Sequence, residues 1–215
     1  MADHPLLAAT YDRFLARTEE RGLAERRHRL LAGARGRVLE IGAGTGLNAA
    51  HYPASAVTEV VALEPDGAMR RRLLPRLAAA GVSYQVEGAG IDDAGFDDGS
   101  FDTIVSTLVL CTVPDVDSAV RRIRRWLAAD GQLLFLEHVR AVGWWGCAQH
   151  AVTPVYSLLA GGCHLDRDTL AAMRGADLFV TDCERFALPA GGPFFASCVQ
   201  GVAQSSLMAP AAGPS

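Results

Sequence analysis

The sequence predicts an α/β fold: a mostly parallel, seven-stranded sheet with an antiparallel last strand and helices on both faces. Short apolar runs rich in β-branched residues alternate with segments of helical period, which is typical of a parallel sheet. A glycine-rich turn follows the first run, and the last two runs follow each other as an antiparallel pair. A chain of 215 residues is large enough to form one domain with a substantial core.

The composition describes an ordinary soluble globular protein, with 50% hydrophobic residues and a formal net charge of −4. The chain has 20 arginines and no lysine, from which we infer a GC-rich genome. The arginines are dispersed or form clusters on helix faces, so we expect no nucleic-acid partner. Asp3 and His4 stand where a signal peptide would be apolar, and no apolar run reaches the roughly 20 residues of a membrane span. The five cysteines include no C-x-x-C pair. We therefore expect a cytoplasmic monomer or homodimer without membrane contact.

Helical spacing of apolar residues over 5–33, with a break near Gly22, predicts two helices before the first strand. That strand ends at Ile41, and glycines at 42, 44 and 46 follow. Such glycines allow a sharp turn and let backbone N–H groups approach a ligand. Their G-x-G-x-G spacing differs from the dinucleotide motif G-x-G-x-x-G, and the chain has no lysine for a P-loop.

The next elements continue the alternation. A helix is expected from Thr45 to His51, followed by a strand over 59–63 that ends at Glu64. An acidic residue about 20 positions after the glycines lies at the tip of the second strand, where it can bind both ribose hydroxyls of a nucleotide. A helix over 66–80 with Asp66 as its N-cap and a third strand over 82–86 follow.

The second half contains the remaining elements. We expect a strand over 103–111, a helix over 115–127, a strand over 132–137 and a helix that carries Trp144 and His150. A short helix over 168–174 precedes the final strands, 177–188 and 194–202. The domain is expected to end at residue 203, and the small, polar residues 204–215 are expected to be disordered.

The segment Val38–Asn48 resembles motif I of the class I S-adenosylmethionine-dependent methyltransferases, and the stretch Asp97–Asp102 resembles the D-G-S-F-D turn before their central strand. The resemblance implies a Rossmann-like fold, S-adenosylmethionine as cofactor and S-adenosylhomocysteine as product. It also implies that residues 1–35 form a helical lid. The implied cofactor-binding residues are Tyr11, Glu40, Gly42, Ala43, Gly44, Thr45, Gly46, Asn48, Glu64, Pro65, Met69, Ala89, Gly90, Thr107 and Leu108.

Three further stretches, Thr107–Val113, Leu136–Val139 and Gly161–Leu165, resemble the methyltransferase-like thiol S-methyltransferases and their bacterial relatives. This resemblance implies a small-molecule thiol as the acceptor, in secondary metabolism or thiol detoxification. Two alternatives to a thiol S-methyltransferase remain. One is a small-molecule O- or N-methyltransferase, and the other is a non-catalytic cofactor-binding partner protein. The expected acceptor-site residues are Phe14, Cys111, His138, Trp144, Trp145, Gln149 and Cys163.

Methyl transfer is an in-line displacement from a good leaving group, so alignment and exclusion of water are the enzyme's main tasks. A thiol with a pKa of about 8.5 ionises with little help, whereas an alcohol or phenol needs a base. His138, at the end of a strand, is the expected base if one is used. Cys147-x-x-His150 and Cys163-His164 offer zinc-type ligands, but their spacing matches no recognised zinc motif, and we expect no metal.

Overall fold

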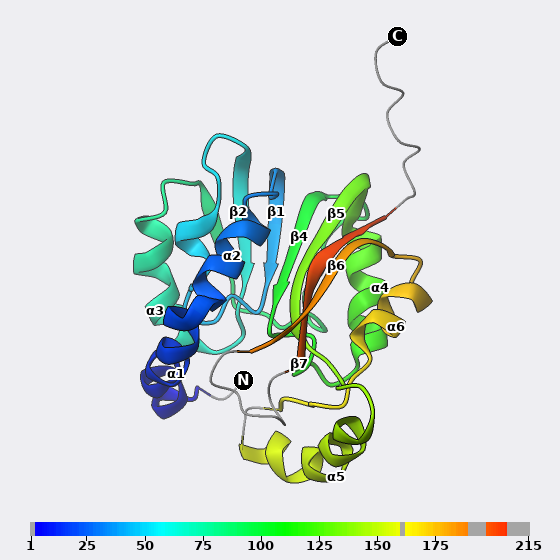
Figure 1. Ribbon diagram of the computed structural model, residues 1–215. Helices are drawn as coiled ribbons and strands as arrows, with labels where there is room; N and C mark the ends of the chain where they lie inside the picture. The colour runs from blue at the N-terminus through cyan, green and yellow to red at the C-terminus, as the bar shows by residue number, and fades with distance from the viewer. Residues whose placement is uncertain (1–2, 160–161, 189–196, 206–215) are drawn as a thin grey trace.

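A seven-stranded sheet forms the centre of the computed structural model, which describes residues 3–159, 162–188 and 197–205 (Figure 1). The strand order is β3-β2-β1-β4-β5-β7-β6. Neighbours from β3 to β5 pair in parallel, and β7 runs antiparallel to both β5 and β6. This confirms the predicted fold class. The strands are β1 Gly36–Ile41, β2 Val57–Leu63, β3 Tyr84–Glu87, β4 Phe101–Thr107, β5 Leu127–His138, β6 Phe179–Ala187 and β7 Ser197–Gln204.

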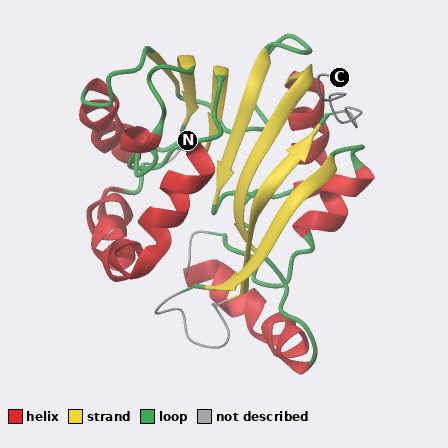
Figure 2. Ribbon diagram, turned by 45° about the horizontal axis from the view of Figure 1, so that its top comes forward, coloured by secondary structure: helices red, strands yellow, loops and turns green. Residues whose placement is uncertain are grey.

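Helices cover both faces of the sheet (Figure 2). Successive side chains of β1 point to opposite faces: Leu39 and Ile41 pack with α4 and α6, whereas Val38 packs with α2. Leu73 and Leu77 of α3 pack against Ala62 of β2. The helical segments are α1 Pro5–Thr18, η1 Glu19–Leu23, α2 Ala24–Leu31, η2 Ala49–His51, α3 Gly67–Ala78, α4 Val116–Trp126, α5 Trp144–Leu159 and α6 Thr169–Gly175.

The helix boundaries have local chemical causes. Asp66, Asp115 and Asp168 each accept backbone N–H groups with their side chains at the N-termini of α3, α4 and α6. Gly22, at φ 122°, interrupts the helical conformation between α1 and α2, as the sequence predicted. These caps determine the residue at which each of the three helices begins.

The helix predicted from Thr45 to His51 is wrong, because only a short 3₁₀ turn, Ala49–His51, forms there. Gly46 has a φ of 87°, and the backbone bonds span three residues, from Gly46 N–H to Ala43 C=O and from Ala49 N–H to Gly46 C=O. Asn48 binds Glu40 and Thr107 with its side chain instead of facing solvent. Tertiary hydrogen bonds therefore determine the conformation of this segment.

Strand ends also differ from the predictions. β3 begins at Tyr84 rather than at residue 82, and β5 begins at Leu127, five residues before the predicted start. β7 includes Gln204, and the hydroxyl of Ser205 donates to the carbonyl of Ala128 at 2.7 Å. The described chain thus continues past the predicted domain end, while residues 206–215 of the predicted tail lie outside the described residues. Among the described helices, none has the length and apolar character needed to cross a membrane.

Candidate functional site

A cavity of about 720 Å³ lies at the carboxyl ends of the parallel strands. In open α/β sheets this edge is where ligands bind, and the volume lies within the range of small-molecule sites. The sequence-predicted cofactor residues that line the cavity are Tyr11, Gly42, Gly44, Glu64, Pro65, Met69, Ala89, Gly90, Thr107 and Leu108. The structure therefore brings most of the predicted set together.

The glycine loop after β1 forms one wall of the cavity. Gly42 and Gly44 adopt φ values of 60° and 57°, which L side chains rarely adopt. A Cβ at Gly42 would lie 2.7 Å from a methyl group of Val109, so the loop packs tightly against the exit of β4. A Cβ at Gly44 would meet nothing nearer than 4.0 Å. The open space above Gly44 is where a ligand can approach the backbone.

Glu64 holds this loop from the tip of β2. One carboxylate oxygen accepts the N–H of Gly44 at 2.7 Å, and the other accepts the N–H of Asp66 at 2.8 Å. The side chain is buried at the cavity wall, and this burial raises the pKa of its carboxyl group. The carboxylate therefore fixes the loop and still has lone pairs for a ligand.

Beneath the loop lies a buried polar cluster, formed by Arg27, Glu40, Asn48, Tyr52 and Thr107. The Glu40 carboxylate accepts from the Asn48 amide and the Tyr52 hydroxyl, both at 2.8 Å. Arg27 donates to Asn48 and to Thr107, each at 3.0 Å. Burial raises the pKa of Glu40. Glu40 and Asn48, predicted to bind cofactor, thus support the loop and line only a small recess next to Arg27 and Thr45.

The N-terminal segment borders the cavity through His4 and Tyr11. His4 binds the carboxylate of Asp66 at 2.9 Å through both its backbone N–H and its imidazole. Thr45 donates to Asp12 of α1 at 2.6 Å. These contacts attach the N-terminal segment to the border of the cavity. The lid role of residues 1–35 stays a prediction. His4 was not expected from the sequence, because only the folded chain brings it to Asp66.

The remaining predicted cofactor residues of the loop have structural contacts. Ala43 donates its N–H to the carbonyl of Leu63 at 2.9 Å and is buried. A Cβ at Gly46 would lie 2.8 Å from Leu73 of α3. Neither residue lines the large cavity. Both position the loop against its neighbours instead.

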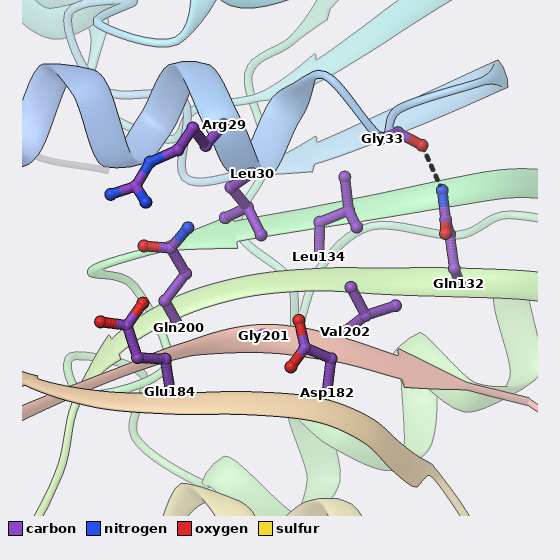
Figure 3. A pocket seen from close by; sticks show the side chains of 10 residues that line it. All are labelled: Arg29, Leu30, Gly33, Gln132, Leu134, Asp182, Glu184, Gln200, Gly201 and Val202. Atoms are coloured by element: carbon purple, nitrogen blue, oxygen red, sulfur yellow. Dashed lines mark hydrogen bonds between the residues drawn. The ribbon is translucent and has the colours of Figure 1, made fainter.

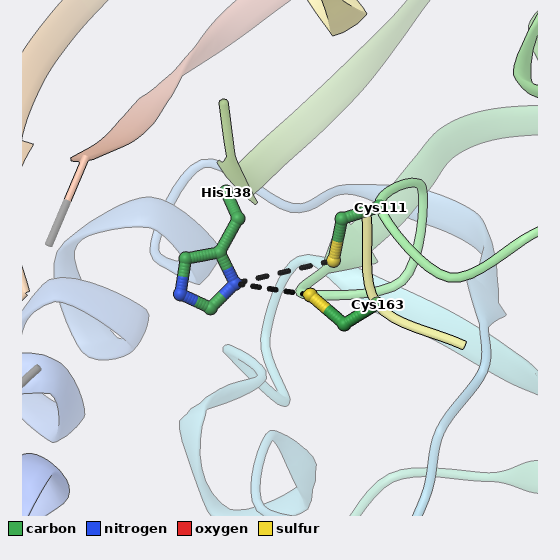
Figure 4. Close-up of side chains that lie close together, drawn as sticks. All are labelled: Cys111, His138 and Cys163. Atoms are coloured by element: carbon green, nitrogen blue, oxygen red, sulfur yellow. Dashed lines mark hydrogen bonds between the residues drawn. The ribbon is translucent and has the colours of Figure 1, made fainter. Parts of the chain in front are cut away.

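Cys111, His138 and Cys163 form a second cluster, the Cys–His cluster, at the same edge of the sheet (Figure 4). Nδ1 of His138 lies 4.0 Å from the sulfur of each cysteine. The hydrogen bond from Cys111 lowers the pKa of Cys163 to about 5, and His138 adds to this effect. Hydrogen bonds to Cys163 and Cys198 outweigh burial and raise the pKa of His138 to about 10. The two shifts favour the thiolate form of Cys163 and the protonated form of His138.

This arrangement bears on the expected role of His138 as a base. Its Nδ1 faces the two sulfurs, its Nε2 is buried without a hydrogen-bond partner among the described residues, and it does not line the large cavity. Next to it, Glu137 accepts from Ser106 at 2.6 Å and from the N–H of Val109 at 3.1 Å. Glu137 thus fixes the β4 exit, and His138 faces the cysteines.

The other predicted acceptor residues are dispersed. Trp144, 65% exposed, stacks on Trp145 with ring centroids 3.8 Å apart at the start of α5. Gln149 is buried and accepts the N–H of Ala141 at 2.7 Å. The side chain of Phe14 lies outside the described residues. Trp144, Trp145 and Gln149 do not line the large cavity.

The metal ligands considered from the sequence do not come together. Cys147 is exposed, and His150 binds the carboxylate of Asp166 at 2.6 Å. Within the described residues, the ligand atoms that converge belong to the Cys–His cluster.

A further cavity, of about 310 Å³, lies between α2 and the strands β5, β7 and β6 (Figure 3). Its lining includes Glu184, which binds Arg26 at 3.0 Å, and Gln132, which donates to the carbonyl of Gly33 at 2.6 Å. It lies under α2, away from the glycine loop. Glu184 and Gln200 bind Arg26, and Arg29 pairs with Glu25, so these polar side chains already have protein partners outside the lining.

Comparison with known proteins agrees with this geometry. Residues 12–174 match the family model described as a methyltransferase domain. The human thiol S-methyltransferase TMT1B is 34% identical over 152 residues, which are 68% of this chain and 62% of that protein. The human thiol S-methyltransferase TMT1A is 31% identical over 143 residues, 64% of this chain and 58% of that protein. This chain therefore spans about three fifths of the length of these relatives.

Among solved structures, geranyl diphosphate C-methyltransferase from Streptomyces coelicolor A3(2), solved with S-adenosyl-L-homocysteine, superposes with a TM-score of 0.66. It is 15% identical, and the match covers 87% of this chain and 76% of that one, so it shows a common fold. The family match, the strand order and the glycine loop all indicate the same family. This chain belongs to the family of class I S-adenosylmethionine-dependent methyltransferases.

Proposed function

We propose that this chain transfers the methyl group of S-adenosylmethionine to a small-molecule thiol. The observation that carries the proposal is the cavity at the carboxyl edge, where Gly44, Glu64 and the Ala89–Gly90 pair line one continuous space together with Thr112, the sequence neighbour of Cys111. Open space above Gly44 and the buried carboxylate of Glu64 fit a nucleoside. The thiol acceptor is supported by the two human relatives, which are thiol S-methyltransferases.

Each part of the cavity has a role in holding the cofactor. Glu64 accepts hydrogen bonds from the ribose hydroxyls, and small residues at Ala89 and Gly90 leave room for the adenine ring between Met69 and Ile91. The Gly42–Gly44 backbone and Thr107 border the methionine end. Arg27 lines the recess under the loop, where its guanidinium binds the Glu19 carboxylate at 3.1 Å as well as Asn48 and Thr107. S-adenosylmethionine supplies an electrophilic methyl group on a sulfonium leaving group.

A thiol acceptor also fits the titratable groups that line the cavity, which are His4, Tyr11, Glu64, Asp66 and Asp92. His4 and Asp66 bind each other, Glu64 binds two backbone N–H groups, and burial raises the pKa of Tyr11 to about 12. Tyr11 and Glu64 are therefore poor bases for an alcohol, whereas Nε2 of His4, whose Nδ1 binds Asp66, is the group that an O- or N-acceptor would use. A thiol ionises near neutral pH and needs mainly to be aligned with the methyl group.

The test is methyl transfer to a panel of aliphatic and aromatic thiols, with matched alcohols, phenols and amines, followed as S-adenosylhomocysteine by mass spectrometry. We expect product with thiols. Product only with phenols or amines would replace the thiol acceptor by an O- or N-acceptor. Cofactor binding without transfer to any acceptor would favour the non-catalytic partner protein.

A further inference from the structure

We propose that Cys111, His138 and Cys163 bind a zinc-class divalent metal ion through two sulfurs and Nδ1, and that the acceptor thiol takes the fourth coordination position. The metal site stands on the side-chain geometry alone. The fourth-ligand assignment rests on the proposed thiol methylation. The proposal departs from the expectation of no metal, which considered pairs close in sequence.

The three ligand atoms already converge. Nδ1 of His138 lies 4.0 Å from each sulfur, and the three atoms lie within 4.8 Å of one another. In a tetrahedral site with zinc–sulfur bonds near 2.3 Å and zinc–nitrogen bonds near 2.0 Å, sulfur and nitrogen ligands lie about 3.6 Å apart. The nitrogen–sulfur distances therefore need to contract by about half an ångström, and the two sulfurs, which lie within 4.8 Å of each other, need to come to about 3.8 Å. Figure 4 shows both cysteines and the imidazole pointing at one another.

The backbone around the cluster is fixed in place. The N–H of His164 donates to the carbonyl of Cys111 at 2.7 Å, and Arg167 donates to the carbonyl of Leu110 at 2.8 Å. These bonds join the loop that carries Cys163 to the segment that carries Cys111. His138 is held by the pairing of β5 with β7, where it lies opposite Cys198. Ligands from three separate segments are thus held before a metal arrives.

Charge and ligand type indicate the metal. Two thiolates and a neutral imidazole around a divalent ion give a neutral centre, which suits burial because an unbalanced charge is costly there. Cys111 and Cys163 are buried, at 1% and 7% exposure. Thiolate and imidazole ligands favour zinc over magnesium or calcium, which prefer oxygen. A site with three protein ligands leaves one position open, as in catalytic zinc sites.

The position of the cluster favours a thiol as the fourth ligand of the metal ion. Val109 and Thr112 line the large cavity, and Cys111 lies between them in sequence. On binding, the acceptor thiol loses its proton to solvent and coordinates as a thiolate. Its sulfur lone pair forms the new bond to the methyl carbon, while the carbon–sulfonium bond breaks and its electron pair stays on S-adenosylhomocysteine. The neutral thioether product is a weaker ligand than the thiolate and leaves the metal.

The first experiment measures the metal content of full-length protein purified without chelators, by inductively coupled plasma mass spectrometry. We expect about one zinc per chain in the native protein and in the matched control Cys183→Ser, whose cysteine is exposed. Cys111→Ser and Cys163→Ser should each lose most of the metal, by tenfold or more. Unchanged circular dichroism and S-adenosylmethionine affinity, measured by calorimetry, would show that these variants fold.

The second experiment replaces zinc by cobalt(II) and adds 2-mercaptoethanol as the probe thiol. We expect sulfur-to-cobalt charge-transfer absorption that Cys163→Ser weakens, and an added thiol should raise the number of coordinating sulfurs from two to three by X-ray absorption. An unchanged spectrum would reject the thiol as the fourth ligand. Folded, metal-free protein with a Cys111–Cys163 disulfide or two free thiols would reject the metal site.

The two proposals fail in different ways. Metal-free protein that still methylates thiols would overturn the metal proposal and leave the proposed function intact. Metal-loaded protein that transfers methyl groups to no thiol would overturn the proposed function and the fourth-ligand assignment, while the metal site would stand.

Discussion

The carboxyl edge of the sheet carries two clusters that are built in different ways. Around the glycine loop, a carboxylate at the tip of β2 binds backbone N–H groups, so Glu64 and Gly44 form a site within one β–turn–β unit. The Cys–His cluster consists of side chains from three segments that are far apart in the sequence, brought together by β4, β5 and the loop before α6. The first cluster suits a constant cofactor. Under the proposed function, the second would contact the acceptor without disturbing the first.

The largest expected effect concerns the contact between the two regions, where Gly42 packs against Val109. Gly42→Ala should lower the free energy of unfolding by about 2 to 4 kcal/mol, because a positive φ and a clash act together. Gly81→Ala is the matched control, with a φ of 73° and nothing within 4 Å, and should cost only about 1 to 2 kcal/mol. Urea unfolding measures both. Equal losses in the two variants would show that the loop does not press on Val109.

The next effect separates the cofactor region from the rest of β2. Glu64→Ala leaves the N–H groups of Gly44 and Asp66 without their acceptor and removes the proposed ribose ligand. We expect affinity for S-adenosylmethionine to fall about 10- to 100-fold, since such losses cost about 1 to 3 kcal/mol. Isothermal titration calorimetry is the measurement. Glu59→Ala, at the other end of the same strand, should bind normally, and equal losses in both would argue against a local site.

A smaller effect tests whether the polar cluster beneath the loop is structural. Burial raises the folded-state pKa of Glu40, so this group adds stability below its unfolded pKa, and that stability is lost as the pH rises through the folded pKa. Glu40→Gln can keep the hydrogen bonds to both Asn48 and Tyr52, because the Tyr52 hydroxyl can also accept a hydrogen bond.

We therefore expect Glu40→Gln to remove this pH dependence, with a change of about 1 kcal/mol at neutral pH and little change in cofactor affinity. Unfolding by urea from mildly acidic to neutral pH checks it. A large loss of affinity in this variant would instead return Glu40 to the cofactor site.

The two regions also differ in how far the sequence predicted them. Gly42, Gly44 and Glu64 were predictable because strand, turn and strand lie within one short stretch, and their spacing defines their geometry. Cys111, His138 and Cys163 were all expected at the acceptor site from the family resemblance, but their convergence into one cluster was not, because they meet only through strand order and loop packing. His138 was expected to act as a base, and the structure directs its Nδ1 at two sulfurs instead.

The same cause explains the failed helix after the glycine loop. Local propensity favoured a helix there, but Asn48 binds Thr107 and Arg27, which are distant in the sequence. Short-range patterns do not contain such bonds. The lid, the cellular location and the oligomeric state remain predictions from the sequence.

The most direct test of this division is a matrix of initial rates over S-adenosylmethionine and thiol concentrations, for the native protein, Glu64→Ala and Cys163→Ser. We expect Glu64→Ala to raise the KM for S-adenosylmethionine with little change in the KM for the thiol. Cys163→Ser should lower kcat or raise the KM for the thiol while cofactor affinity stays unchanged. If both variants altered the same parameter, or if the native protein transferred no methyl group to thiols, the account of two separate regions would be contradicted.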